Sequence, residues 1–150
     1  MLGARRTLGE LELMSDRRVD GFFYGLFMDI DILKQSLVTA VKPRRGYVDG
    51  YGLRIGRRAT LVPSEGARSY GMVFAITHND LDRLYSSLGL MDYRPEAVLV
   101  STLDGGRLPA LCYNLLELPG PDEANADYAA RLRETLGRLK FPSKYITSIS

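Results

Sequence analysis

The chain has 150 residues, and its 20 lysines and arginines stand against 18 aspartates and glutamates, which gives a formal net charge of +2. This length fits one domain with a hydrophobic core of its own. With 45% hydrophobic and 25% charged residues, the composition is close to the globular average, which excludes a disordered chain, a collagen-like fibre and a coiled-coil rod.

The N-terminal segment differs from the rest of the chain in its residue composition and in its pattern of apolar residues. Residues 1–20 mix arginines with acids and contain only a short leucine pattern. We expect them to form a weakly ordered N-terminal extension. Residues 21–150 then form a single domain.

The first elements of this domain are a strand and a helix. Residues 21–24 form a short aromatic run that stops at Gly25 and is typical of a strand. Apolar residues then recur at helical spacing over residues 29–41, which predicts a helix that ends before Pro43 and Gly46.

From residue 47 to residue 76 the pattern changes to short apolar runs. These runs cover residues 51–55, 59–62 and 70–76, with glycine and proline between them. Such spacing indicates short strands joined by turns.

A second helix is signalled at Thr77. Thr77 and Asp80 form the S/T-x-x-D/E pattern that begins helices, and apolar residues at helical spacing follow. The helix should end near Gly89.

The last third of the chain predicts a hairpin and two helices. Residues 96–103 and 108–116 are strand-like, and the Asp-Gly-Gly sequence at 104–106 is typical of a hairpin turn. Residues 123–139 form an amphipathic helical pattern, and Pro142 begins one more turn or short helix. This order of elements is typical of an α+β domain whose strands curl into a small, closed or nearly closed, mixed β-barrel with flanking helices.

Several functional classes are disfavoured by the residue types. The arginines occur in scattered pairs with little net charge, so we expect no nucleic-acid binding. One cysteine, Cys112, and one histidine, His78, are too few for a metal site built from these ligands. We expect no cofactor. No apolar run reaches the roughly 20 residues that cross a bilayer, so we expect no membrane association and a cytoplasmic location.

The common catalytic motifs are absent, including the P-loop and the nucleophile elbow. What remains is the turn at Tyr24-Gly25-Leu26-Phe27, which directly precedes a helix. Its backbone amides could bind an anion or a carboxylate. The alternative is an ordinary strand-to-helix turn that needs glycine for its geometry.

At this turn the sequence resembles the gamma-glutamylcyclotransferase family, which includes the avirulence-induced-gene-like proteins of plants. In that family an aromatic strand leads into a Tyr-Gly-Ser/Thr-x-Leu/Met turn. The resemblance spans roughly residues 22–145. Four further features agree in order: Gly50-x-x-Leu53; Pro63-x-x-Gly66-x-x-x-Tyr70-Gly71-x-Val73; Leu81-Asp82 followed by Tyr93 and Val98; and Tyr128 followed by Gly137, Leu139, Pro142 and Tyr145.

The resemblance implies a fold and an activity. Members of the family have a small closed or nearly closed β-barrel with flanking helices. Their turn supplies backbone donors to the substrate carboxylate, and a glutamate after a Leu-Asp-x-x sequence moves protons while a γ-glutamyl amine attacks its own γ-carbonyl, which releases 5-oxoproline. The corresponding position here, after Leu81-Asp82-Arg83-Leu84, is Tyr85.

The chain departs from the family at two positions. A tyrosine with its ordinary pKa near 10 is almost wholly protonated at pH 7, so Tyr85 can donate a hydrogen bond but is a poor base. Leu26 stands where the family has serine or threonine, which removes a hydroxyl. We therefore expect a more apolar pocket than that of the family, lined by residues 24–27, Tyr85 and Tyr93.

Other residues could replace the missing base. Asp82 lies three positions before Tyr85, so the two can share a helix face, and a water molecule is a further alternative. Glu65, Asp92 and Glu96 are expected near loops at the barrel ends, where solvent-exposed acids are common.

Two reactive residue types need no catalytic interpretation. His78 stands at a helix start, where a polar residue is ordinary, and Cys112 lies in an apolar strand, which is typical of a buried core cysteine.

Two functions remain open. The first is a gamma-glutamylcyclotransferase-like enzyme that forms 5-oxoproline by an altered mechanism. The second is a non-catalytic small-molecule binding or interaction module that kept the fold and lost the base. In both, the ligand is a small γ-glutamyl or amino-acid-like molecule, and the protein is a monomer or a homodimer.

Overall fold

The computed structural model describes residues 17–87 and 89–150. The expected extension over residues 1–20 lies almost wholly outside them. Its C-terminal boundary is corrected, because a strand already begins at Arg18 and pairs with Thr77. The elements in chain order are β1 (Arg18–Phe23), the 3₁₀ turn η1 (Leu26–Met28), α2 (Ile30–Gln35), β2 (Val41–Ile55), β3 (Ala59–Thr77), α3 (His78–Tyr85), β4 (Tyr93–Thr102), β5 (Arg107–Leu115), α4 (Ala126–Arg138) and α5 (Ser143–Thr147).

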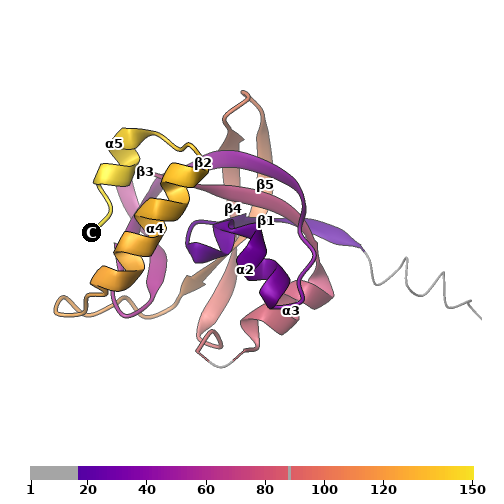
Figure 1. Ribbon diagram of the computed structural model, residues 1–150, viewed down its shortest axis with the longest axis horizontal. Coiled ribbons are helices and arrows are strands. Elements are labelled where there is room, and N and C mark those ends of the chain that lie inside the picture. Colours follow the sequence, from indigo (N-terminus) through magenta and orange to yellow (C-terminus); the bar gives the residue numbers. More distant parts are fainter. Residues whose placement is uncertain (1–16, 88) are drawn as a thin grey trace, which may run out of the picture.

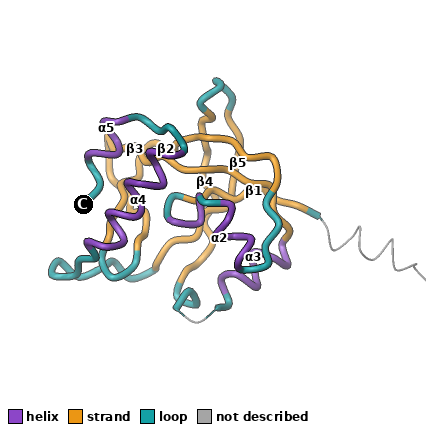
Figure 2. Tube along the Cα trace, in the orientation of Figure 1, coloured by secondary structure: helices purple, strands orange, loops and turns teal. Residues whose placement is uncertain are grey.

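The five strands close into a barrel in the order β1-β3-β2-β4-β5. All neighbours are antiparallel except β1 and β5, which run parallel where Gly21 pairs with Leu111. The helices lie outside the barrel, with α4 and α5 on one flank and α2 and α3 near one end (Figures 1 and 2). The predicted α+β fold, a closed mixed barrel with flanking helices, is confirmed.

The predicted helix over residues 29–41 is wrong in its C-terminal half. Asp29 caps the helix by accepting a hydrogen bond from the Asp31 amide at 2.9 Å, but α2 ends at Gln35 and Leu37 has a φ of +60°. Strand β2 begins at Val41 because this segment pairs with β3, a long-range interaction that outweighs local helical spacing.

Strands β2 and β3 are longer than the short runs predicted between residues 47 and 76. They form one antiparallel hairpin whose true turn is at residues 56–58. Gly50 and Gly66, with φ values of +84° and +80°, interrupt the ladder where its register shifts between Asp49 and Tyr51. These glycines therefore bend continuous strands rather than end them.

Two clusters of buried side chains hold the domain together. One fills the barrel and includes Phe22, Val73, Val100 and Cys112. The other lies between the barrel wall and the helices, where its largest buried members are Phe74, Met28, Leu33, Ile76, Leu81, Leu132 and Leu136. Successive residues of β3 contribute to opposite clusters, as the alternation of side chains along a strand requires.

Glycines at close contacts provide a test of this packing. A Cβ at Gly71 would collide with the Phe23 carbonyl oxygen and lie 2.8 Å from the Phe22 ring, whereas a Cβ at Gly137 in α4 meets nothing within 4 Å. We expect Gly71→Ala to lower the free energy of unfolding by about 1–3 kcal/mol and Gly137→Ala to raise it by about 0.5–1 kcal/mol. Urea denaturation of both variants measures the difference, and equal effects would contradict the barrel packing.

Candidate functional site

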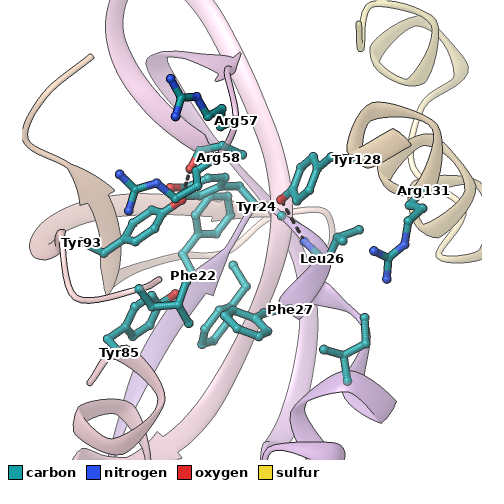
Figure 3. Close-up of a pocket in the computed structure, with 15 residues that line it drawn as sticks. Phe22, Tyr24, Leu26, Phe27, Arg57, Arg58, Tyr85, Tyr93, Tyr128 and Arg131 are labelled. Carbon is teal, nitrogen blue, oxygen red and sulfur yellow. Dashed lines mark hydrogen bonds between the residues drawn. The ribbon is translucent and has the colours of Figure 1, made fainter. Parts of the chain in front are cut away.

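A pocket of about 330 Å³ opens at one end of the barrel (Figure 3). It lies where the turn after β1, the β2–β3 turn, the end of α3, the start of β4 and helix α4 come together. Its volume is within the usual range for small-molecule sites. The lining residues are Phe22, Phe23, Tyr24, Gly25, Leu26, Phe27, Ile32, Arg57, Arg58, Ala59, Tyr85, Leu90, Tyr93, Tyr128 and Arg131.

The structure brings most of the sequence-predicted residues together in this pocket. The turn residues 24–27 come from the end of β1, Tyr85 from the last turn of α3 and Tyr93 from the first position of β4, and all of them line it. Asp82 is the exception, since it is exposed on α3 and is not among the lining residues.

The turn at Gly25 is held by helix α4. The Leu26 amide donates a hydrogen bond to the Tyr128 hydroxyl at 3.3 Å, and the Met28 amide donates to the Gly25 carbonyl at 3.0 Å. Gly25 has a φ of −112°, so its backbone does not require glycine. The lack of space is what requires glycine at this position, because a Cβ on residue 25 would collide with the Tyr128 hydroxyl.

Three of the four pocket tyrosines use their hydroxyls within the protein. Tyr24 donates to the Tyr113 carbonyl at 2.7 Å, Tyr93 donates to the Ala59 carbonyl at 2.5 Å, and Tyr128 accepts from the Leu26 amide.

The hydroxyl of the fourth tyrosine, Tyr85, makes no hydrogen bond with the described residues, while its ring is firmly packed. The ring stacks on Tyr113 with centroids 3.9 Å apart and contacts Phe27 edge to face at 6.2 Å. Its hydroxyl is thus the pocket's uncommitted neutral hydrogen-bonding group among the tyrosines.

Burial keeps these hydroxyls protonated. Desolvation raises the pKa of Tyr85, and that of Tyr24, well above the usual value of 10.0. The pKa of Tyr93 is raised for the same reason. At neutral pH these groups carry no charge, and none of them can act as a general base.

The carboxylates considered from the sequence do not line the pocket. Glu65 is exposed on β3, and Asp92 forms an ion pair with Arg58 at 3.1 Å with a largely exposed side chain. Glu96 accepts hydrogen bonds from Tyr51 at 3.0 Å and from the Asn114 amide group at 2.8 Å. Among the described residues, the lining contains neither aspartate nor glutamate.

Three arginines supply the charge that the sequence interpretation missed. Arg57 and Arg58 come from the β2–β3 turn, and Arg131 comes from α4 on another side of the pocket (Figure 3). Arg57 approaches Glu123 at 3.8 Å. The sequence signal was weak, because an arginine pair after a glycine is typical of a solvated turn, and only the fold places Arg131 opposite it.

His78 and Cys112 lie away from this pocket. His78 is exposed at the start of α3, and Cys112 is fully buried inside the barrel, where desolvation raises the pKa of its thiol. Within residues 17–87 and 89–150, no group of three or more histidine, cysteine or acidic side chains is arranged to hold a metal ion. In the same part of the chain, no helix has the length and apolarity needed to span a membrane.

Comparison with solved structures identifies the fold. A structure described as a gamma-glutamyl cyclotransferase aligns over 89% of this chain and 88% of its own length, with 17% sequence identity and a TM-score of 0.71. An uncharacterized protein from Homo sapiens aligns over 90% of this chain and 89% of its own, with 18% identity and a TM-score of 0.70.

An AIG2-like protein from Mus musculus aligns over 74% of this chain and 90% of its own length, with 17% identity and a TM-score of 0.52. No protein-family model matches the sequence, and no curated protein matches it. The chain therefore has the fold of the gamma-glutamyl cyclotransferase and AIG2-like structures, as the sequence resemblance predicted.

The contact between Gly25 and Tyr128 can be tested by a double-mutant cycle. Gly25→Ala should lower the free energy of unfolding by about 1–3 kcal/mol, because the added methyl group displaces the Tyr128 hydroxyl. Tyr128→Phe removes that hydroxyl and leaves the nearest ring carbon 3.7 Å from the new methyl group. We expect the double variant to be more stable than the sum of the two single effects by about 1 kcal/mol. Additive effects, measured by urea denaturation, would show that the two groups do not meet.

Proposed function

We propose that this protein binds a small carboxylate-bearing ligand with a γ-glutamyl or amino-acid-like skeleton in the pocket at the barrel end, and that it does so without a side chain that can act as a general base. The observation that carries the proposal is the composition of the lining, which has three arginines, four tyrosines and no carboxylate among the described residues.

Charge favours an anionic ligand. Arginine presents several N–H donors in a planar fork that matches a carboxylate. Arg131 forms no ion pair with the described residues, so its charge is available to a ligand. The apolar remainder of the lining, including Phe27 and Leu90, excludes water and strengthens such an interaction.

The turn at Gly25 supplies further donors. Between described residues, neither the Gly25 amide nor the Phe27 amide donates a hydrogen bond. Both residues line the pocket. Backbone amides and an arginine on different sides of one pocket together suit a carboxylate.

Ligand binding is tested by thermal stabilisation. We expect γ-glutamyl amino acids, γ-glutamyl amines, 5-oxoproline or N-acetyl amino acids to raise the melting temperature, because a ligand that binds only the native state stabilises it. Arg131→Gln should reduce the shift, whereas Arg107→Gln, which removes the same charge from the start of β5, should not. If no carboxylate in this set raises the melting temperature, the proposed function is wrong.

A second candidate, a cyclotransferase with an altered mechanism, is favoured by the alignment with the gamma-glutamyl cyclotransferase structure over most of both chains. Tyr85 lines the pocket at the position where the sequence resemblance puts the catalytic glutamate. Its protonated hydroxyl could orient a γ-glutamyl carbonyl but could not accept the amine proton.

The two candidates are separated by measuring 5-oxoproline release from γ-glutamyl substrates. We expect the wild type to be nearly inactive, and Tyr85→Glu to be faster by up to about 10²–10⁴-fold, the usual contribution of a general base. Tyr85→Gln is the matched control for Tyr85→Glu, because glutamine has the size of glutamate but no carboxylate. Rapid turnover by the wild type that persists in Tyr85→Phe would show that another base exists and that the protein is an enzyme.

A further inference from the structure

The distribution of charge around the pocket is one-sided. Arg57, Arg58 and Arg131 all line it. The acids nearest to Arg57 and Arg58 pair with them but do not line the pocket: Glu123 lies 3.8 Å from the Arg57 guanidinium, and Asp92 lies 3.1 Å from that of Arg58. Among the described lining residues no negative charge is available to a ligand cation.

The aromatic side chains do not replace that missing charge. Aromatic rings can bind an ammonium group through their faces. Here one face of Tyr85 is covered by Tyr113, in a nearly parallel stack at an angle of 4°. Tyr93 is already approached by the Arg58 guanidinium, which lies 5.9 Å from its ring centroid. The faces of Tyr85 and Tyr93, two of the aromatic residues that line the pocket, are therefore partly occupied, that of Tyr93 by a cation of the protein.

The Tyr85 hydroxyl suits a neutral partner. It is protonated and has no hydrogen-bond partner among the described residues, so it can donate to a ligand carbonyl oxygen. It cannot provide a countercharge. An ammonium group transferred from water to this position would lose its hydration without gaining an ion pair, which is unfavourable.

From these observations we propose that the pocket selects carboxylates whose nitrogen is uncharged, such as N-acylated amino acids, over the zwitterionic amino acids with the same skeleton, and that Tyr85 determines this preference. The inference rests on the proposed function, because it specifies the chemical class of the ligand of the same site.

The preference is measured with matched pairs of ligands. Isothermal titration of the full chain at neutral pH compares N-acetylphenylalanine with phenylalanine, and N-acetylglutamate with glutamate. We expect the N-acetyl member of a pair to bind about tenfold or more tightly. Tetramethylammonium, a cation without a carboxylate, should not bind.

Variants at Tyr85 test the residue itself. Tyr85→Glu adds a carboxylate and Tyr85→Gln is its uncharged match. We expect the Glu variant to bind the zwitterionic member about tenfold more tightly than the Gln variant does. Tyr85→Phe, which retains the stacked ring, should weaken binding of the N-acetyl member about threefold to tenfold through loss of the hydroxyl donor. This third variant keeps the test decisive if the Glu variant does not fold, as judged by circular dichroism.

The outcomes separate the two proposals. Equal affinity for both members of a pair, or binding of tetramethylammonium, would overturn the selectivity and leave carboxylate binding intact. Absence of binding for every carboxylate would overturn both. A preference that persists in Tyr85→Glu and is unchanged in Tyr85→Phe would show that Tyr85 does not determine it.

Discussion

The contact between the Tyr128 hydroxyl and the turn at Gly25 determines how the barrel end is covered. It joins α4 to the segment that follows β1, two parts of the chain 102 residues apart. Because only glycine leaves room for that hydroxyl, the turn and the helix constrain each other. The Leu26 and Phe27 side chains are thereby held on one side of the pocket, and Arg131, one helical turn after Tyr128, is held on another.

The burial of the tyrosines then determines which chemistry the pocket can support. Burial raises the pKa of Tyr85 and of Tyr24, so the tyrosines contribute hydrogen bonds and apolar surface but no charge. The arginines are left as the charged groups of the described lining. This lining is the reason that we propose anion binding rather than proton abstraction for the pocket, although the fold is shared with a structure described as a gamma-glutamyl cyclotransferase.

Local signals predicted much of the fold. The hairpin turn at 104–106 and the cap at Thr77, whose hydroxyl accepts from the Asp80 amide at 3.1 Å, depend on neighbouring residues alone and were identified from the sequence. The helix over residues 29–41 was overextended because the pairing of β2 with β3 is a long-range interaction. Tyr24, Tyr85, Tyr93 and the turn came from the family resemblance, whereas Tyr128 was matched to the family without being assigned to the pocket that it lines. The arginines were missed because nothing local distinguishes them from solvated surface residues.

Mapping of backbone amide chemical shifts by NMR, during titration with a carboxylate ligand such as N-acetylphenylalanine, tests the central claim most directly. Anion binding in this pocket should shift the amides of residues 25–27 and 57–58 and leave those of the turn at 104–106 unchanged. Shifts confined to the 104–106 turn or to other surfaces, or no shifts at all, would contradict the assignment of this pocket as a carboxylate site.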